Sequence, residues 1–406
     1  MALRASGHAL LRLRSVAGHM KLLFVHAGAE LYGADRILLE LVGGLLQAGH
    51  ECRVVLPGDG PLRPALEGVG AVVGLHNLGV LRRRYFTPAG LLNRALRLKR
   101  AVAFISGLIR DHGIEVVHTN TTAVFAGALA ARRCGVPHVW HVHEITTRPH
   151  WYAALVARLL ERWSQQVVTV SDATRRHLCA LNPALVAKTA TVYNGIDPAR
   201  AVGGVRGRVR ESHGWPADAI VVGMIGRINW WKGQGTLVDS AAVLLARRDD
   251  LRFLLVGGVF AGEEALREQL LAQVGALGPR AACVAVEDFR PDIADVLADI
   301  DVFVLPSIEP DPFPTVVLEA MAASKPIVAF GHGGVVEMVD GGRAGLLCPP
   351  VSAQALAQAI ETLADSADER RRLGGLARQR VGERFTQRAF LDAFARVYRE
   401  SLEARP

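Results

Sequence analysis

Short apolar runs alternate with longer amphipathic ones along almost the whole chain, and this alternation constrains the fold more than any other feature. In the first half, LLFVHA is followed by RILLELVGGLLQAGH and then by CRVVLP, and EVVHTN, PHVWHVHE and QVVTVS continue the series. Apolar strands separated by amphipathic helices are typical of a parallel sheet with helices on both faces. The pattern therefore predicts an α/β protein.

The alternation is interrupted once, between residues 197 and 219, where DPARAVGGVRGRVRESHGWPADA is rich in Gly, Ala and Arg and has no strand pattern. We interpret this stretch as the passage between two domains. The alternation restarts with IVVGMIG and continues through RFLLVGG, CVAVEDF, DVFVLPS and PIVAFG. A chain of 406 residues suits two domains of this kind. We predict two Rossmann-like, doubly wound domains, 20–197 and 198–385, that face each other across a cleft.

The two ends of the chain are predicted to differ in their contribution to the fold. Residues 1–19 hold three arginines and no acid, and the first strand-like run follows them directly. We exclude this leader from the fold, either as a disordered segment or as the product of a start codon assigned too far upstream, with an amphipathic anchor as the alternative. Residues 386–406 are predicted to form a C-terminal helix that packs back toward the first domain.

Composition narrows the class of protein. Half of the residues are hydrophobic and 21% are charged, which favours a large core and argues against disorder. The five cysteines lie far apart, without the spacing of a metal site, and are interpreted as buried thiols in a reducing compartment: Cys52, Cys134, Cys179, Cys283 and Cys348. No apolar run approaches the roughly 20 residues of a membrane span. We therefore expect a cytoplasmic protein without a metal site.

Acidic residues follow one strand of the second half, in PSIEPDPFPTVVLEAMA at 306–322. The prolines disfavour a helix until Thr315, which is a suitable N-cap residue, so Asp311 is expected on the loop and Glu319 early in the helix. A free carboxylate accepts two adjacent hydrogen bonds, which suits vicinal hydroxyls of a sugar or ribose. The alternative role for Glu319 is to complement the helix dipole.

Basic residues follow another strand, in GRINWWKGQGT at 226–236. Arg227 and Lys232 flank a short turn that begins at Gly226, and a helix is expected to open at Thr236. Cations next to free helix N–H groups form an anion site that suits a diphosphate. Together with the hydroxyl-binding acids, this loop predicts a site for a nucleotide-sugar.

These two stretches resemble the signature of the family 4 retaining glycosyltransferases, the "glycosyl transferases group 1", which have the GT-B fold. The family signature has two glutamates separated by seven residues, and that spacing places Asp311 and Glu319 at the two positions and leaves Glu309 outside. GRINWWKG is similar to the Arg…Lys clamp of the family. YNGID at 193–197 resembles its domain-junction motif, and the resemblance extends over nearly everything from Met20 onward.

The resemblance implies a retaining glycosyltransferase that moves a sugar from a UDP- or GDP-type donor to an acceptor hydroxyl, in the synthesis of a cell-surface polysaccharide, glycolipid or glycoside. It implies no metal ion and no other cofactor. Arg227 and Lys232 would stabilise the leaving diphosphate, Glu319 would hold the ribose, and Asp311 would lie near the transferred sugar. The chain departs from the family pattern at Asp311, one methylene shorter than the usual glutamate, and at Pro314, where glycine is commoner. Arg290 is also predicted to bind the donor.

The first domain offers weaker signals. Gly28 and Gly33 bracket the turn after the first strand, where glycines let backbone amides approach a donor, although a packing role is equally consistent. His141 and His143 are two residues apart on a strand and share one face. The resemblance places His143 near the donor sugar, as a catalytic residue. His141 is predicted to be a satisfied core histidine.

His118 and Asn120, at the end of EVVHTN, are further candidates for the cleft.

A basic segment in the first domain suggests a different partner. Between Gly68 and Arg110 there is no acid, whereas there are eight cations, with most of them at 82–100. A helix over 91–109 would place one apolar stripe on its inner side: Leu91, Ala95, Leu98, Val102, Ile105 and Ile109. The cations fall outside this stripe, which predicts either a solvated face or a surface for an anionic membrane or a lipid-linked acceptor. If the segment is a surface for an anionic membrane, the protein would bind peripherally to the inner face of the membrane.

The net charge is +8, but no basic motif is interleaved with aromatic residues, so we expect no nucleic acid partner. Three other functions stay open on the same two-domain plan. They are a nucleotide-sugar epimerase, a phosphorylase, and a non-catalytic sugar-nucleotide-binding protein. A phosphorylase of the familiar kind needs a pyridoxal-bearing lysine, for which the sequence holds no signal.

Overall fold

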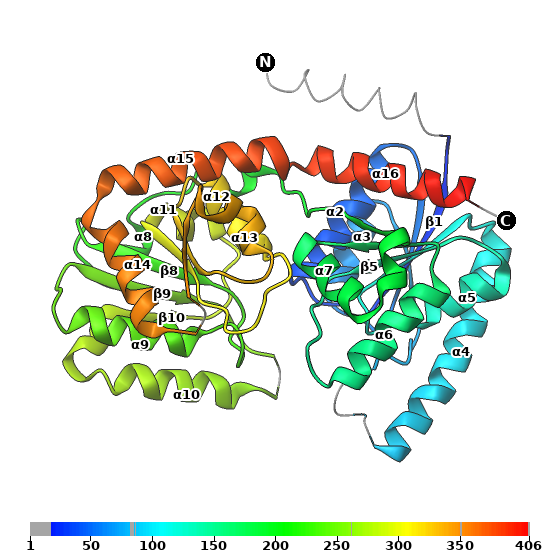
Figure 1. Cartoon of the computed structure of the whole chain (residues 1–406), viewed down its shortest axis with the longest axis horizontal. Helices are drawn as coiled ribbons and strands as arrows, with labels where there is room; N and C mark the ends of the chain where they lie inside the picture. Colours follow the sequence, from blue (N-terminus) through cyan, green and yellow to red (C-terminus); the bar gives the residue numbers. More distant parts are fainter. Residues whose placement is uncertain (1–17, 82–84, 86, 261, 350, 405–406) are drawn as a thin grey trace. The chain divides into compact units, whose positions relative to one another are not determined.

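The computed structural model describes residues 18–81, 85, 87–260, 262–349 and 351–404. They form two compact units (Figure 1). Unit 1 runs to Asn194 and takes in the C-terminal segment from Gln387, whereas unit 2 extends from Gly195 to Thr386. The division therefore falls three residues before the boundary expected at 197, and one residue after the boundary expected at 385. Most of the leader, residues 1–17, lies outside the described residues.

Unit 1 is built on a parallel sheet, in which the described residues form seven strands in the order β3-β2-β1-β4-β5-β6-β7. Their bounds are β1 Lys21–His26, β2 Glu51–Leu56, β3 Val72–Leu75, β4 Val116–Asn120, β5 His138–Val142, β6 Gln166–Thr169 and β7 Thr189–Thr191. The chain adds strands outward from β1 in one direction and then crosses to β4 and adds strands in the other direction. The order therefore reverses between β1 and β4, where His26 is paired in register with Asn120.

Helices cover both faces of this sheet (Figure 1). They are α2 Gly33–Gln47, α3 Leu62–Gly68, α4 Pro88–His112, α5 Ala126–Cys134, α6 His150–Trp163, α7 Asp172–Leu181 and α16 Gln387–Glu403. Alternate residues of β1 serve the two faces, as the period of a strand requires. Leu22 and Phe24 pack in one cluster with α2, α3 and α16, whereas Leu23 and Val25 pack in another with α4 and α5.

Unit 2 has a second parallel sheet, in which the described residues form six strands in the order β10-β9-β8-β11-β12-β13. Their bounds are β8 Ile220–Ile225, β9 Leu251–Val256, β10 Val284–Glu287, β11 Val302–Leu305, β12 Ile327–Phe330 and β13 Leu346–Cys348. The helices are α8 Arg208–Ser212, α9 Gln234–Leu245, α10 Glu264–Gly275, α11 Ile293–Asp299, α12 Thr315–Ala322, α13 Val335–Met338, α14 Ala353–Asp365 and α15 Ala367–Arg384. The order of strands reverses between β8 and β11.

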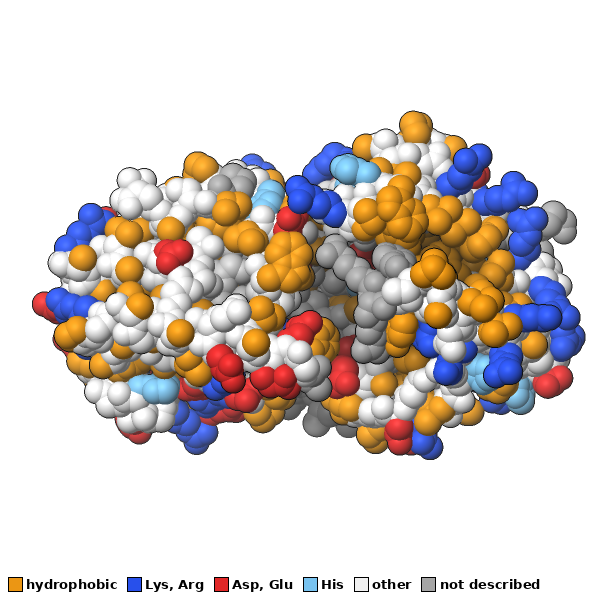
Figure 2. Space-filling model, turned by 90° about the horizontal axis from the view of Figure 1, so that it is seen from below, with side chains coloured by type: hydrophobic (Ala, Val, Ile, Leu, Met, Phe, Trp, Pro, Cys, Tyr) orange, Lys and Arg blue, Asp and Glu red, His pale blue; other side chains and the backbone are white. Residues whose placement is uncertain are grey.

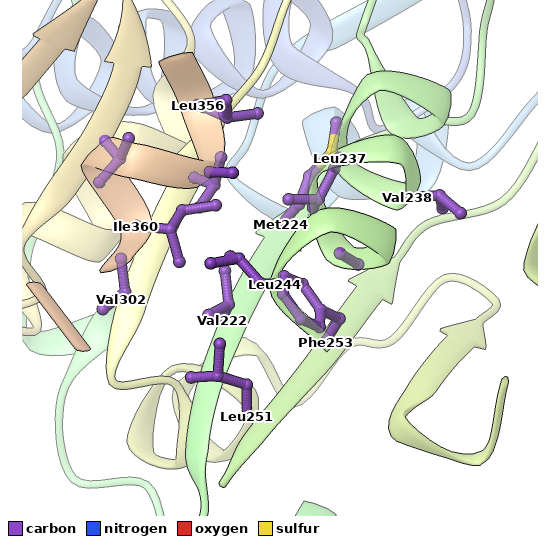
Figure 3. Close-up of a cluster of buried hydrophobic side chains, with 14 of the residues drawn as sticks. Val222, Met224, Leu237, Val238, Leu244, Leu251, Phe253, Val302, Leu356 and Ile360 are labelled. Atoms are coloured by element: carbon purple, nitrogen blue, oxygen red, sulfur yellow. The ribbon is translucent and has the colours of Figure 1, made fainter. Parts of the chain in front are cut away.

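The main core of unit 2 lies between its sheet and the helices α9 and α14 (Figure 3). Met224 of β8 and Phe253 of β9 pack there with Leu237 and Leu244 of α9 and with Ile360 of α14. Burying each such side chain stabilises the fold by about 1.5–3 kcal/mol. Since α9 follows the basic loop directly, this packing also fixes where that loop ends.

The segment interpreted as a passage between domains is instead bound to unit 2. Arg210 of α8 is only 2% exposed, and its Nη1 donates to Asp299 Oδ1 at 2.5 Å while its Nη2 donates to Asp301 Oδ2 at 2.6 Å. Asp299 also accepts from the backbone N–H of Val209 at 2.7 Å. Arginine–carboxylate pairs of this kind have no sequence period, so the pattern of apolar residues could not indicate them.

Two helix starts differ from the sequence prediction. Thr315 is the first residue of α12 rather than its N-cap; Pro314 holds that position, and no side chain caps the helix. Helix α9 begins at Gln234, two residues before the expected Thr236. Its N-cap, Gly233, has φ +82°, and a Cβ there would lie 1.8 Å from the carbonyl oxygen of Pro306. Only glycine fits this turn, and the helix therefore starts directly after it.

Helix α4 is buried along only part of the predicted stripe. Ile105 and Ile109 pack in the core, but Leu91 is 47% exposed and Ala95 is exposed as well. Figure 1 shows the N-terminal end of α4 reaching below the rest of unit 1. The first two positions of the stripe therefore have no core to cover, whereas Leu98 and Val102 are partly buried against the same core as Ile105. None of the helices in the described ranges is both long and apolar enough to cross a membrane.

Candidate active site

Three of the candidate residues of unit 2, Arg227, Lys232 and Asp311, lie on the loops at the carboxyl ends of β8 and β11, where the order of strands reverses. In open α/β sheets, ligands bind in the crevice outside the strand ends at such a point. The basic loop follows β8 and the acidic loop follows β11, and the two strands are neighbours in the sheet. The structure thus brings together two stretches that are about 80 residues apart in sequence.

The basic loop is folded by its own side chains. Asn229 Oδ1 accepts from the backbone N–H groups of Trp231 at 3.1 Å and Lys232 at 2.9 Å, which closes an Asx-type turn. The guanidinium carbon of Arg227 lies 3.5 Å from the centre of the Phe260 ring, a cation–π contact that orients the group. Asn229 and Phe260 were not predicted as site residues, although both follow strands.

The acidic loop is held from both sides. Ile308 donates its backbone N–H to the carbonyl of Trp231 at 2.8 Å, which ties it to the basic loop. On the other side, His332 Nε2 donates to the carbonyl of Ser307 at 2.7 Å, and the Gly334 N–H donates to the carbonyl of Asp311 at 2.8 Å. These bonds position the loop without using any of the predicted ligand-binding side chains.

An ion pair joins the two loops. Lys232 Nζ lies 2.5 Å from Asp311 Oδ2, and Asp311 is only 6% exposed. Asp311 is therefore not the free carboxylate that the sequence analysis assumed. An ammonium group has three N–H donors, so Lys232 keeps two of them for a further acceptor such as a phosphate oxygen.

Two other predicted residues of unit 2, Glu319 and Arg290, do not lie on the loops that directly follow β8 and β11. Glu319 is partly buried in the second turn of α12, whose neighbouring Leu318 and Ala320 are buried and fix the helix. Arg290 follows β10, two strands away from β8 in the sheet. It pairs with Glu287 at 2.9 Å and with Asp292, and these carboxylates raise the pKa of Arg290 above its usual range. The structure does not bring Arg290 to the β8–β11 junction, and its role in donor binding stays a prediction.

A chain of buried polar side chains marks the equivalent junction of unit 1, between β1 and β4. His26 Nε2 lies 2.6 Å from Asp35 Oδ1, Asn120 Nδ2 lies 3.0 Å from His26 Nδ1, and His143 Nε2 lies 2.8 Å from Asn120 Oδ1. His26 and Asn120 are the last residues of their strands, and His143 follows β5. His143 and Asn120 are candidates from the sequence, whereas His26 and Asp35 were missed.

Burial shifts the protonation of this region. The pKa of His143 is lowered to about 3, first by burial and then by the neighbouring His26 and His118, so the ring is neutral at neutral pH. Glu144 Oε2 accepts from the backbone N–H groups of His143 at 3.1 Å and Thr122 at 3.2 Å. Burial nevertheless raises the pKa of Glu144 to about 7, against the effect of those donors.

The two glycines predicted to face a ligand have different surroundings. A Cβ at Gly28 would lie 2.7 Å from Asp35 Oδ1, so the absence of a side chain leaves room for that carboxylate. This supports the packing interpretation of Gly28. Gly33 is the first residue of α2, and a Cβ there would meet no atom within 4 Å. Its role toward a donor stays a prediction.

His118 and His141 are core residues of unit 1. His118 Nδ1 lies 2.8 Å from the hydroxyl of Tyr398 on α16, and neither histidine is exposed. His118 is therefore a buried residue rather than a cleft candidate. His141 was predicted to be satisfied, but both of its ring nitrogens lack a hydrogen-bond partner among the described residues. In the same residues, no group of three or more His, Cys, Asp or Glu side chains is placed to hold a metal ion.

Two parallel α/β sheets, each with its polar loops at the point where the order of strands reverses, define the architecture of the GT-B glycosyltransferases. Residues 205–380 match the family described as "Glycosyl transferases group 1", and residues 32–200 match "Glycosyltransferase Family 4". The chain therefore belongs to the group 1 glycosyltransferases of family 4.

Individual relatives agree with this assignment. The chain is 30% identical over 356 residues to the D-inositol 3-phosphate glycosyltransferase of Saccharomonospora viridis, which covers 80% of this chain and 81% of the relative. It is 30% identical over 313 residues to the alpha-maltose-1-phosphate synthase of Mycolicibacterium smegmatis, with 70% and 79% covered. The crystal structure of Anabaena HepE in complex with UDP-glucose superposes with a TM-score of 0.81 and 26% identity over 94% of this chain and all of HepE.

Proposed function

We propose that the protein transfers a sugar from a nucleoside diphosphate sugar, of the UDP or GDP type, to an acceptor hydroxyl, with retention of the anomeric configuration and without a metal ion. The observation that carries the proposal is the junction of β8 and β11, where Arg227 and Lys232 lie on one loop and Asp311 on the next. The structure of HepE with UDP-glucose supports a donor of the UDP type.

The stabilisation of the leaving diphosphate follows from these charges, whereas the same-face attack is what membership of the family implies. When the bond between the sugar carbon and the diphosphate oxygen breaks, negative charge grows on the leaving diphosphate. Arg227 offers a planar fork of donors and Lys232 a compact charge with two donors beyond its contact to Asp311, and both favour the dissociated state. The acceptor oxygen attacks the same face of the sugar, and its proton passes to an oxygen of the leaving diphosphate. The configuration is therefore retained.

The acceptor is proposed by class only. Two of the relatives act on or produce phosphorylated polyols and sugars, as the names D-inositol 3-phosphate glycosyltransferase and alpha-maltose-1-phosphate synthase state. We propose an acceptor that belongs to a cell-surface polysaccharide, a glycolipid or a glycoside, and that presents a hydroxyl group.

The test begins with the donor. Thermal unfolding is measured with UDP-, GDP- and ADP-sugars, because a ligand that binds the folded state raises the melting temperature. The donor that raises it is then incubated with candidate acceptors in the presence of EDTA, and the anomer of the product is determined by NMR. Transfer with retention supports the proposal. Conversion of the donor sugar without an acceptor indicates an epimerase, binding without turnover indicates a sugar-nucleotide-binding protein, and loss of activity with EDTA contradicts the metal-free mechanism.

A second proposal concerns the exposed half of α4, which we propose as a contact surface for an anionic lipid membrane carrying the acceptor. Leu92 is 64% exposed and Leu96 is 55% exposed, and Lys99 and Arg100 are exposed on the following turns. Figure 2 shows hydrophobic side chains gathered on the lower face of unit 1, with Lys and Arg side chains around them. Exposed leucines flanked by cations favour the interface of an anionic bilayer. Arg82, Arg83 and Arg84, part of the same predicted segment, lie outside the described residues.

Vesicle sedimentation tests this surface. Vesicles with phosphatidylglycerol should bind the protein more strongly than phosphatidylcholine vesicles, and the difference should fall with salt. Leu92→Ser with Leu96→Ser should reduce binding to the anionic vesicles at least about fivefold, whereas Leu271→Ser, at an exposed leucine of α10, should not. If the double variant binds the anionic vesicles as strongly as the Leu271→Ser control, α4 is an ordinary solvated helix.

A further inference from the structure

The direction of each hydrogen bond among these unit 1 side chains follows from the groups that can only accept or only donate. At one end, Asp35 Oδ2 accepts from the backbone N–H of Tyr32 at 2.9 Å, and Oδ1 lies 2.6 Å from His26 Nε2. The position of the proton in this second contact follows from the other nitrogen of the His26 ring.

The next link depends on the orientation of the Asn120 amide. Its Nδ2 lies 3.0 Å from His26 Nδ1 and 3.4 Å from the carbonyl oxygen of Ala34. The carbonyl can only accept, so the amide group that faces it has to be the NH₂ group. His26 Nδ1 then accepts from the same NH₂ group, so the proton of the ring lies on Nε2 and is donated to Asp35 Oδ1. Asn120 Oδ1 is left to face His143.

The last link fixes the tautomer of His143. An amide oxygen can only accept, so the 2.8 Å contact requires a proton on His143 Nε2. Burial keeps the ring neutral, and Nδ1 therefore carries a lone pair. Nδ1 makes no hydrogen bond to any part of the chain that the structure describes, and it is not among the buried unpaired polar atoms there. It is therefore open to solvent.

We propose that Asp35, His26 and Asn120 are positioning residues that hold His143 in the Nε2–H tautomer, so that its Nδ1 accepts a hydrogen bond from a hydroxyl group of the sugar substrate. This inference rests on the proposed function and adds the chemistry that unit 1 recognises. A lone pair attracts a hydroxyl and repels a phosphate oxygen. His143 is thus a site for sugar, not for diphosphate.

The surroundings of the chain agree with a positioning role. The pairing of β1 with β4 sets His26 beside Asn120, and α2 supplies Asp35 from its first turn. Gly28 leaves the space that the Asp35 carboxylate occupies. The positions of these hydrogen-bonded side chains are thus fixed by the sheet register, by a helix and by a glycine. His143, which is bonded to the last of them, therefore has little freedom to rotate.

The tautomer itself can be measured, independently of any activity. In long-range ¹H–¹⁵N spectra of the full chain, the signals that disappear in His143→Gln identify the ring, and its Nδ1 should resonate as an unprotonated nitrogen. Asp35→Asn and Asn120→Leu, made separately in case one fails to fold, should each give a mixture of tautomers. A wild-type ring protonated at Nδ1, or variants with an unchanged ring, would overturn the proposal.

Thr119→Val is the matched control. Thr119 precedes Asn120 on β4 and is equally buried, but its hydroxyl bonds to the ring of His138 at 2.8 Å, on the other face of the sheet. This variant should change the signals of His138 and leave those of His143 unchanged.

Turnover gives the second measurement, with the donor that the screen above identifies. Asn120→Leu should lower kcat about 10-fold or more with less than about a threefold change in the KM of the donor, because the contact strengthens in the transition state. An asparagine at position 143 can place its acceptor near Nδ1 and a glutamine near Nε2, so His143→Asn should retain more activity than His143→Gln. The reverse order would overturn the assignment of Nδ1. If no donor is turned over but the tautomer is as stated, the proposed function fails and the positioning chain stands.

Discussion

The two units place polar side chains at the same point of the same topology, but with opposite chemistry. In unit 1 the junction of β1 and β4 holds a neutral sequence of imidazole and amide groups that ends at one carboxylate, Asp35. In unit 2 the junction of β8 and β11 holds the charged groups Arg227, Lys232 and Asp311. The topology thus determines where the polar side chains gather, but not their chemistry.

Burial explains the difference. His26 and Asn120 are 1% and 0% exposed, and an isolated charge at that depth is costly. Apart from Asp35, the side chains at the unit 1 junction are therefore groups that hydrogen-bond without a net charge, which suits the hydroxyls of a sugar. Unit 2 keeps its charges because Lys232 and Asp311 neutralise each other and Arg227 lies over an aromatic ring, which suits a diphosphate.

Acidification should separate the two units most strongly. Every histidine with a lowered pKa in the described part of the chain lies in unit 1, and burial is the main cause for the four deepest: His118, His138, His141 and His143. Between about pH 6.5 and about pH 3, these histidines bind protons in the unfolded chain but not in the folded chain. The free energy of unfolding of unit 1 therefore decreases as the pH is lowered through this window, by about 1.4 kcal/mol per pH unit for each histidine.

The raised pKa of Glu144, about 7, acts in the opposite direction, because between its ordinary value and pH 7 the folded chain binds the extra proton. The net loss between pH 7 and pH 5 is on the order of 5 kcal/mol. Hydrogen exchange followed by mass spectrometry at the two pH values, corrected for intrinsic rates, should show faster opening in unit 1 than in unit 2. Equal loss of protection in both units would contradict the comparison.

The charged junction is tested by removing its cations. Arg227→Ala and Lys232→Ala should each lower turnover about 10²–10³-fold, since each removes a group that stabilises the leaving diphosphate. Lys232→Ala also leaves Asp311 buried without its cation, so the melting temperature of this variant is measured beside its turnover to separate lost stability from lost catalysis. Arg378→Ala, at an exposed arginine of α15, is the control. Near-normal turnover in both single variants would remove the clamp from the mechanism.

The position of the candidate site in unit 2 could be predicted from sequence because this candidate site consists of loops that directly follow strands. Alternating apolar runs give the strands, and the rule that ligands bind at strand carboxyl ends gives the loops. Arg227, Lys232 and Asp311 all occur within a few residues of such ends. Their side chains were correctly placed at one sheet edge, but the ion pair between two of them was not foreseen, because spacing alone does not show which loops meet.

The row of hydrogen-bonded side chains in unit 1, from Asp35 to His143, could not be predicted in the same way. His26 and Asn120 are 94 residues apart, and only the register of β1 against β4 makes them neighbours. Asp35 lies in the first turn of a helix, where acids are common because of the helix dipole, so its sequence position does not indicate its contact with His26. The pairing of Arg210 with Asp299 was missed for the same reason, since it joins a segment without periodicity to the end of α11. What sequence patterns leave out is contact between polar groups that are distant in sequence.

The division of roles between the acids of unit 2 can be sharpened by binding measurements. Glu319→Gln should weaken free nucleotide and intact donor alike, by about 1.5–3 kcal/mol if the ribose hydroxyls are buried against it. Asp311→Asn should leave binding of the free nucleotide unchanged and impair transfer. Calorimetry with UDP or GDP and with the corresponding sugar nucleotide separates the two effects.

Glu309→Gln is the matched control for these acids, since Glu309 lies on the same loop but outside the spacing of the signature. It should alter neither binding nor transfer. If Asp311→Asn loses free nucleotide as strongly as Glu319→Gln, the proposed division is wrong. If Glu309→Gln alone abolishes transfer, Glu309 takes the place of Asp311 beside the sugar.

The smallest effect is expected at Arg290, which tests how far the charged site extends along the sheet. Its guanidinium is already engaged by Glu287 and Asp292, at a strand end two positions from β8. Partly exposed pairs of this kind contribute little, so Arg290→Ala should change the free energy of unfolding by less than about 1 kcal/mol and weaken donor binding only about threefold. Arg248→Ala, at an arginine paired with Asp250 and Asp365, provides the control for lost ion pairs. A loss of donor affinity as large as that of Glu319→Gln, absent in Arg248→Ala, would show that the donor site reaches from the β8–β11 junction to the end of β10.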